Sequence, residues 1–256
     1  MAESIIRMIS NKLLDTLYPP GLYCNCCGKI TDNTRTYGLC NDCMRDIAWI
    51  NGRSCVKCGK AMSETDPGEV CFYCRNHEHI FDKGYACAEY GAHEKAMLYE
   101  LKYASRGDIG KAIGEIVYDR MAAELGEEVL AGAYDTVIPV PAFKERRDRR
   151  GFNQAEIIAS SFSEYAGLEC RTDILIRVRE TKAMKGLGPS ERRANIKGAF
   201  KIKEQKLQPI NGKKLLLIDD IYTTGATIDE AASVLKSGGA ASVDFAVFAA
   251  GADIIN

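Results

Sequence analysis

The chain has 256 residues, of which 46% are hydrophobic, and its formal net charge at pH 7 is −1. This length accommodates one α/β core together with a small additional module. Because the overall charge is near neutral, binding to nucleic acid through a general positive charge is excluded, and any such affinity must come from a local basic patch. No stretch approaches the roughly 20 apolar residues of a membrane-spanning helix.

The N-terminal segment has an amphipathic pattern. Apolar side chains recur between residues 5 and 17, and Arg7, Lys12 and Asp15 interrupt them. A secretory signal would instead combine a charged start, an apolar core and a cleavage site of small residues. We therefore expect a cytoplasmic protein without a membrane span, in which cysteines stay reduced.

Eight of the eleven cysteines form C-x-x-C pairs. The pairs follow one another at similar separations, and Gly28 and Gly59 stand directly after the second cysteine of two of them, as in zinc knuckles. This pattern predicts two zinc ribbons, each holding one structural Zn²⁺. The simplest assignment uses consecutive pairs, while an interleaved arrangement stays open from spacing alone. The first site would be Cys24, Cys27, Cys40 and Cys43, and the second Cys55, Cys58, Cys71 and Cys74.

These cysteines have two other possible roles. A disulfide framework requires an oxidising compartment, and nothing in the sequence favours export. An iron–sulfur cluster is compatible with C-x-x-C pairs, and spacing leaves the choice between zinc and iron open. The first 80 residues have too little apolar pattern to fold without metal, so the metal would be structural. Of the remaining cysteines, Cys26 could compete for metal and Cys87 is expected to pack in a core; Cys170 has no assigned role.

From about residue 81, strand and helix patterns alternate along the chain. Strands are predicted at 85–90, 135–140, 214–218 and 242–249, and helices at 93–103, 108–125, 154–165 and after the 214–218 strand. Alternation of this kind predicts a parallel sheet flanked by helices. We expect two domains: residues 1–80 with an N-terminal helix and the double zinc-ribbon module, and residues 81–256 with the α/β fold.

Two basic segments are expected near the ligand crevice. Five basic residues occupy seven positions between 144 and 150, directly after the predicted strand 135–140, and parallel sheets bind ligands at the carboxyl ends of their strands. Arginine forks suit a pyrophosphate, so Arg146 and Arg150 are the best candidates, although a solvated charged loop is the alternative. Residues 177–203 contain nine basic and two acidic residues with Gly186 and Pro189 among them, which predicts a mobile, positively charged flap.

The most specific pattern lies between residues 215 and 235. The apolar run 215–218 has no alternation, which is typical of a strand covered on both faces. At its carboxyl end Asp219 and Asp220 can accept hydrogen bonds from vicinal hydroxyls, and the following turn offers backbone N–H groups and hydroxyls at a helix start. The pattern predicts a sugar-phosphate site. The turn consists of Thr223, Thr224, Gly225, Ala226 and Thr227.

Two alternatives apply to this turn. Thr227 and Glu230 fit a capping box, in which case the hydroxyl of Thr227 would serve its own helix. The segment as a whole could also be an ordinary strand–turn–helix connection. A Walker loop and a G-x-G-x-x-G dinucleotide loop are both missing from the sequence.

The strand, acidic pair and Thr/Gly turn together resemble the signature of type I phosphoribosyltransferases for 5-phosphoribosyl-1-pyrophosphate (PRPP). The resemblance implies that Asp219 and Asp220 hold the ribose hydroxyls and that residues 223–227 hold the 5-phosphate, with Mg²⁺ accompanying PRPP. It implies a type I phosphoribosyltransferase-like sheet for residues 81–256. It does not identify a second substrate.

Further motifs resemble the ComF family of the ComFC/GntX type over essentially the whole chain. They are the run Arg150–Gln154, Leu101-Lys102-Tyr103 with Gly107-Asp108, and the C-x-x-C module ahead of the PRPP loop. The resemblance implies a phosphoribosyltransferase-like protein with a role in DNA uptake and natural transformation, beside a ComFA-type helicase. Lys102 then joins Arg146 and Arg150 as an expected anion contact.

Two functions follow as competing hypotheses. In the first, the protein binds Mg-PRPP and transfers the phosphoribosyl group to an acceptor with release of pyrophosphate; no residue stands out as acid, base or acceptor-recognition group, so catalytic residues are unknown. In the second, the fold is catalytically inactive and binds nucleic acid or docks a partner. Single-stranded DNA would follow the basic segments, with Phe143, Phe152 or Tyr222 available for stacking. We favour a PRPP-binding protein with a competence role.

Overall fold

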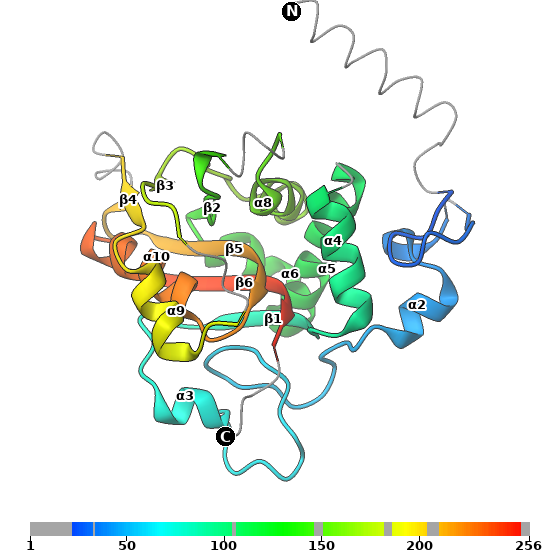
Figure 1. Ribbon diagram of the computed structural model, residues 1–256, viewed down its shortest axis with the longest axis horizontal. Helices are drawn as coiled ribbons and strands as arrows, with labels where there is room; N and C mark the ends of the chain where they lie inside the picture. Colours follow the sequence, from blue (N-terminus) through cyan, green and yellow to red (C-terminus); the bar gives the residue numbers. More distant parts are fainter. Residues whose placement is uncertain are drawn as a thin grey trace, which may run out of the picture.

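A four-stranded parallel sheet forms the centre of the molecule (Figure 1). The computed structural model describes residues 22–32, 34–103, 106–145, 151–181, 186–203 and 210–251. The strand order is β1-β6-β5-β2, and all three pairings are parallel. The predicted parallel α/β architecture is therefore confirmed. The strands are β1 (Gly84–Glu89), β2 (Thr136–Pro139), β5 (Lys214–Tyr222) and β6 (Ser242–Ala250).

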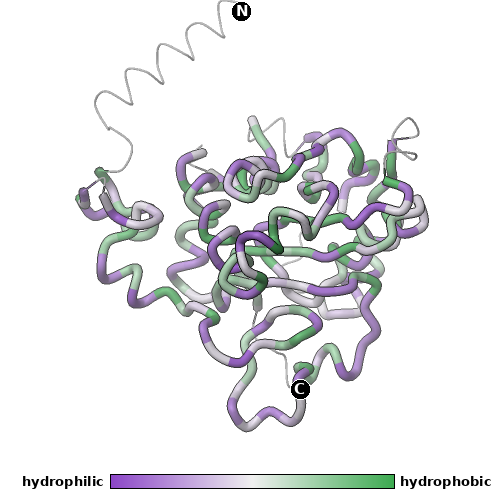
Figure 2. Tube along the Cα trace, turned by 180° about the vertical axis from the view of Figure 1, so that it is seen from behind, coloured by the Kyte–Doolittle hydropathy of each residue, from purple (hydrophilic) through white to green (hydrophobic). Residues whose placement is uncertain are grey.

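Helices cover both faces of this sheet. On β5, Leu216 and Ile218 pack into a hydrophobic core shared with α5 and α8, whereas Leu215 and Leu217 pack into a second core shared with α10. All four side chains are fully buried, which explains why the run shows no alternation. In the hydropathy view from behind, the central strands show green and white segments (Figure 2). The helices are α4 (Ala92–Tyr103), α5 (Gly107–Leu125), α6 (Glu127–Ala133), α8 (Gln154–Ala166) and α10 (Ala226–Ser237).

The basic segment predicted as a mobile flap contains regular, packed structure. An antiparallel pair, β3 (Leu175–Arg177) with β4 (Phe200–Ile202), flanks α9 (Pro189–Ile196), which packs against α10. Ile196 and Phe200 are buried, so they anchor this segment to the domain. Gly188 and Pro189, which belong to the segment expected to form a flap, are the N-cap and first residue of α9. Residues 189–202 thus consist of packed regular structure, whereas the expected mobility of this segment stays a prediction; residues 182–185 lie outside the described part of the chain.

The two cysteine-rich units pack directly on the sheet domain. Each contains a tight knuckle followed by a short helix, α2 (Asn41–Asp46) in the first and α3 (Phe72–Asn76) in the second. Cys24 and Cys43 belong to the core that includes α5, and Cys55 and Cys58 to the core that includes α10. The boundary at residue 80 stays a prediction. No helix in the described part of the chain combines the length and apolar character needed to cross a bilayer.

Candidate functional site

The acidic pair and the Thr/Gly turn lie at the carboxyl end of β5. The strand continues beyond its apolar run to Tyr222, so Asp219 and Asp220 are part of the strand. The turn then enters α10, whose N-cap Gly225 has φ +80°, a left-handed conformation that favours glycine. We call residues 223–227 the Thr-Gly loop. The structure thus brings all seven predicted PRPP-contacting residues together at one strand end.

The Thr-Gly loop has the features of an anion site. Among the described residues, no backbone carbonyl accepts a hydrogen bond from the N–H groups of residues 224–227. These donors lie at the N-terminus of α10, where the helix dipole favours negative charge. A hollow of about 30 Å³ lies at the loop, lined by residues 221–228 together with Arg192.

Arg192 of α9 was not singled out from the sequence as a site residue. Its Nη1 donates to Oγ1 of Thr223 over 2.7 Å, and its Nε donates to the carbonyl of Leu187 over 2.9 Å. The guanidinium therefore lies beside the Thr-Gly loop and adds a positive charge there. The only sequence signal was its place in the basic segment 177–203, because contact with the loop depends on how α9 docks.

The capping-box alternative for Thr227 is wrong. The helix begins at Ala226, and no side chain caps it. Glu230, the expected reciprocal partner, accepts a hydrogen bond from the N–H of Gly198 over 2.6 Å instead. The hydroxyl of Thr227 is therefore not committed to its own helix end.

The acidic pair is held by a lysine from α4. Lys102 forms an ion pair with Oδ2 of Asp220, and Oδ1 of Asp219 accepts the N–H of Asp220 over 2.9 Å. Burial, with a further contribution from the charge of Asp220, raises the pKa of Asp219 to about 8. Such a carboxyl is ready to exchange a proton near neutral pH. The expected role of Lys102 as an anion contact stays a prediction.

The basic loop after β2 is anchored at both described ends beside β5. Val140 donates its N–H to the carbonyl of Ile218 over 2.9 Å, and the buried Asn153 donates from Nδ2 to the carbonyl of Val140 over 3.1 Å. The chain therefore leaves the fold at Val140 and re-enters it at Asn153, next to Ile218, which precedes the acidic pair. Arg146 and Arg150 themselves lie outside the described residues.

Both four-cysteine groups have the dimensions of a single-ion site. In each group the four sulfurs lie within 4.8 Å of one another; those of Cys27 and Cys40 are 3.7 Å apart, and those of Cys58 and Cys71 are 3.8 Å apart. A tetrahedral zinc with Zn–S bonds of about 2.3 Å requires sulfur separations of about 3.8 Å. The sulfurs gather in the two sets of the simplest assignment, not in interleaved sets.

The disulfide alternative does not fit this geometry. All eleven cysteines lie in the described residues and all are free. Sulfur separations of 3.7 Å and 3.8 Å are well beyond the roughly 2.05 Å of a disulfide bond. Backbone N–H groups instead point at sulfur, from Cys40 to Cys24 and from Cys71 to Cys55, each over 3.3 Å. Such hydrogen bonds stabilise metal-bound thiolates.

Comparison with known proteins gives the family. Residues 111–253 match the phosphoribosyl transferase domain, and residues 13–75 match the double zinc ribbon domain. Competence protein ComFC of Streptococcus pneumoniae is 30% identical over 210 residues, covering 80% of this chain and 84% of that protein. The chain belongs to the ComF family. The resemblance inferred from its motifs is thereby confirmed, as is a phosphoribosyltransferase-like sheet preceded by a double zinc-ribbon module.

Other relatives match at slightly lower identity. Competence protein F of Haemophilus influenzae is 28% identical over 202 residues, covering 78% of this chain and 84% of that protein. DNA utilization protein YhgH of Escherichia coli is 26% identical over 212 residues, covering 81% and 88%.

Solved structures show only partial likeness. The glutamine PRPP amidotransferase from B. subtilis has a TM-score of 0.35 at 19% identity, covering 58% of this chain and 30% of that chain. The orotate phosphoribosyltransferase from Aeropyrum pernix has a TM-score of 0.30 at 19% identity, covering 59% and 63%. At these scores the likeness carries no argument about this ComF chain.

In this ComF protein the second ribbon touches the base of the Thr-Gly loop. His79, which follows α3, hydrogen bonds through Nδ1 to Oδ2 of Asp229 over 2.8 Å, and the N–H of Ile80 donates to Oδ1 of the same carboxylate over 2.8 Å. Asp229 is in the first turn of α10. On the other side of the loop, Arg193 donates to the hydroxyl of Tyr73 over 3.3 Å. These contacts could not be predicted from local sequence, because they join segments far apart in the chain.

The raised pKa of Asp219 predicts a pH-dependent affinity for Mg-PRPP. A carboxyl with a pKa of about 8 is mostly protonated at pH 7, whereas the ribose hydroxyls and Mg²⁺ favour the carboxylate. Affinity should therefore rise with pH, by about fivefold between pH 7 and pH 8, and level off above that. Calorimetry across this range measures it, with Asp219→Asn as the control that should lose the slope. An unchanged slope in Asp219→Asn would assign the proton to another group.

Proposed function

We propose that this protein binds Mg-PRPP at the carboxyl end of β5. The observation that supports this best is that two kinds of binding group follow one another in the chain. Asp219 and Asp220 on β5 can accept hydrogen bonds from hydroxyls, and the loop directly after the strand has unused N–H donors at a helix start. The carboxylates would hold the ribose hydroxyls, and the Thr-Gly loop with Arg192 would hold the 5-phosphate. Lys102 and the anchored basic loop with Arg146 and Arg150 would face the pyrophosphate.

Mg²⁺ would enter with PRPP and neutralise part of the pyrophosphate charge. The residues present fit this, because carboxylates suit a hard divalent cation and the basic groups near them suit phosphate oxygens. A site of this kind supports transfer of the phosphoribosyl group to an acceptor with departure of pyrophosphate. Among the described residues no side chain is placed as an evident acid or base for an acceptor, so the proposal is for PRPP binding first and transfer second.

The biological setting we propose is DNA uptake. Relatives carry the names competence protein F, competence protein ComFC and DNA utilization protein. We propose a cytoplasmic protein that works beside a ComFA-type helicase and meets single-stranded DNA at its basic segments. In the alternative, the crevice binds only nucleic acid or a partner. The stacking role expected for Tyr222 is wrong, because this ring is buried and stacked on Phe245 at 4.8 Å between centroids.

Calorimetric titration of the zinc-loaded protein with Mg-PRPP tests the proposal. Wild type should show saturable binding, and Asp219→Asn/Asp220→Asn should weaken it at least about a hundredfold, since several charge-assisted hydrogen bonds are lost at once. Glu127→Gln/Glu128→Gln is the matched control, because it neutralises an adjacent, exposed acidic pair on α6. Absence of binding by wild type, or equal losses in both variants, would refute the assigned site.

A further inference from the structure

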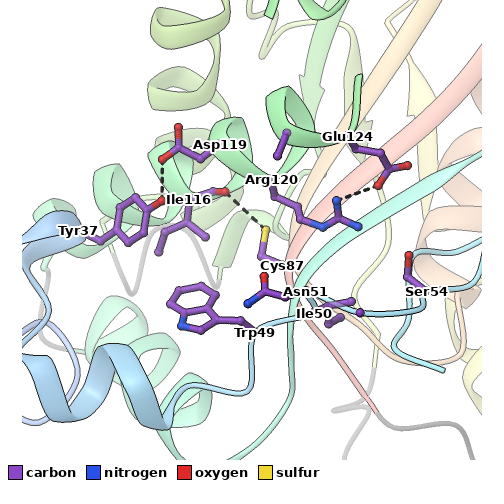
Figure 3. A pocket seen from close by; sticks show the side chains of 12 residues that line it. Tyr37, Trp49, Ile50, Asn51, Ser54, Cys87, Ile116, Asp119, Arg120 and Glu124 are labelled. Atoms are coloured by element: carbon purple, nitrogen blue, oxygen red, sulfur yellow. Dashed lines mark hydrogen bonds and ion pairs between the residues drawn. The ribbon is translucent and has the colours of Figure 1, made fainter. Parts of the chain in front are cut away.

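A second and larger cavity lies between α5 and the segment that joins the two ribbons (Figure 3). Its volume is about 660 Å³, and it shares no lining residue with the hollow at the Thr-Gly loop. Small-molecule sites commonly have volumes of about 300–1,000 Å³ and lie where separate structural units meet. The position and size of this cavity therefore indicate a ligand site distinct from the proposed PRPP site.

One wall of the cavity is aromatic and held in place. The indole N–H of Trp49 donates to the carbonyl of Met44 over 2.7 Å, and the hydroxyl of Tyr37 donates to Oδ2 of Asp119 over 2.6 Å. The two ring centroids are 6.2 Å apart at an angle of 52°. The N–H of Ile50 donates to the carbonyl of Cys87 over 2.9 Å, and the N–H of Glu89 donates to the carbonyl of Ala48 over 2.8 Å, so the joining segment is fixed along β1. A preformed aromatic wall of this kind suits a flat ring that stacks on it.

The charges around the cavity disfavour an anion. Arg120 is paired with Glu124 over 2.8 Å and donates from Nε to the carbonyl of Ala86 over 3.3 Å, so its charge is already matched. Glu124 also pairs with Lys83 over 2.7 Å. Asp119 adds a negative charge that no described cation pairs with. Because Arg120 and Lys83 both already pair with Glu124, a phosphate group would find no unmatched cation among the charged residues named here, unlike at the Thr-Gly loop.

The remaining polar groups offer both donors and acceptors to a neutral ligand. Among the described residues, no hydrogen bond uses the side chain of Asn51 or that of Ser54, and Oδ1 of Asp119 is also unused. An amide offers a donor and an acceptor side by side, and a carboxylate accepts from an amino group, which are the contacts that read the edge of a nucleobase. Figure 3 shows Asn51 beside Trp49 and Cys87.

From this combination we propose that the cavity binds a nucleobase or nucleoside without phosphate, stacked on Trp49 and hydrogen bonded by Asn51 and Asp119. The inference does not depend on PRPP binding. The thiol of Cys87 would contribute packing only, because burial raises its pKa to about 12 and keeps it neutral.

The only tryptophan of the chain is in this wall, which gives a direct readout. Full-length, zinc-loaded protein is titrated with adenosine, cytidine, guanosine and thymidine while tryptophan emission is followed, and then with the matching 5′-monophosphates and with spermidine. We expect saturable quenching by at least one nucleoside and at least tenfold weaker binding of its monophosphate. Asn51→Ala should weaken nucleoside binding about tenfold, equivalent to loss of a bidentate contact.

Asn211→Ala is the matched control, since Asn211 is exposed and outside the cavity lining. It should leave nucleoside affinity unchanged, and circular dichroism of both variants verifies folding. The proposal is overturned if no nucleoside quenches the emission, if a monophosphate binds as tightly as its nucleoside, or if only spermidine binds. The last result would identify the cavity as a site for organic cations.

Discussion

Removing metal from the second ribbon is expected to abolish binding at the Thr-Gly loop, whereas removing it from the first should change the affinity for Mg-PRPP by no more than about threefold. The reason is the position of the second ribbon. Its core residues Cys55, Cys58 and Cys71 share one hydrophobic cluster with Tyr222, which directly precedes the Thr-Gly loop, and Ala226, which lies in it. A structural zinc contributes on the order of 10 kcal/mol to the folding free energy of its module. Its loss is therefore expected to unfold the second ribbon and to remove the contacts that hold the Thr-Gly loop.

The contacts that transmit this effect are specific. Phe81, just after the ribbon, packs edge-on against Phe245 at 4.7 Å and stacks on His79 at 4.6 Å. The buried Lys60 of the knuckle has its Nζ 5.4 Å from the ring of Tyr222. His79 in turn holds Asp229 at the start of α10. The first ribbon contacts the opposite side of the sheet, where Tyr37 reaches Asp119 on α5.

The experiment compares Cys58→Ser/Cys71→Ser with Cys27→Ser/Cys40→Ser. Each double variant should lose one zinc per chain, measured by elemental analysis. Only the first should lose Mg-PRPP binding and show faster amide hydrogen exchange at residues 224–227. Because a cysteine variant can unfold more widely, Asp229→Asn provides a second measurement with all eight ligands intact. It should retain two zinc ions and still bind Mg-PRPP about tenfold more weakly. Wild-type rates of amide hydrogen exchange at residues 224–227 in Cys58→Ser/Cys71→Ser would contradict this coupling.

The parts of the site that could be predicted are those encoded by adjacent residues. The strand predicted at 214–218, the acidic pair and the Thr-Gly loop follow from an apolar run without alternation and from turn chemistry, both of which act over a few positions. The continuation of the strand to Tyr222 was seen only in the structure. The parts that could not be predicted depend on docking between distant segments. Arg192 reaches Thr223 only because α9 packs on α10, and Asp229 gave no local sign that it would bind His79.

The sequence pattern of a strand also fails to predict which side chains are buried where a second module packs against the end of the strand. Tyr222 follows two acidic residues and was expected at the crevice, yet it turns into the core formed with the second ribbon. The short helices α2 and α3 escaped prediction because they are about one turn long and begin at metal-ligand cysteines, whose geometry, not helix propensity, fixes them. For Tyr222, packing of the cysteine module against β5 therefore decides a side-chain direction that the local sequence could not express.

Substituting Gly225 is expected to damage the Thr-Gly loop far more than its backbone conformation alone requires. A left-handed φ costs a residue with a side chain roughly 1–2 kcal/mol. At Gly225, with φ +80°, an added Cβ would also lie 2.9 Å from Cε1 of His79 and 2.9 Å from the hydroxyl oxygen of Tyr222. Overpacking of this kind costs about 1–3 kcal/mol more. Gly225→Ala should therefore destabilise the protein by about 2–5 kcal/mol and weaken Mg-PRPP binding at least tenfold.

Gly212 separates the two contributions. It also has a left-handed φ, of +70°, but an added Cβ there would meet nothing within 4 Å. It precedes β5, at the end of the strand opposite the Thr-Gly loop. Gly212→Ala should therefore pay only the conformational cost, about 1 kcal/mol in urea unfolding, and keep full affinity. Equal losses of stability and affinity in Gly225→Ala and Gly212→Ala would mean that His79 and Tyr222 move aside for the methyl group, and hence that the second ribbon does not fix the Thr-Gly loop. A larger loss in Gly225→Ala would show that those two side chains constrain the loop, because they are what the methyl group meets.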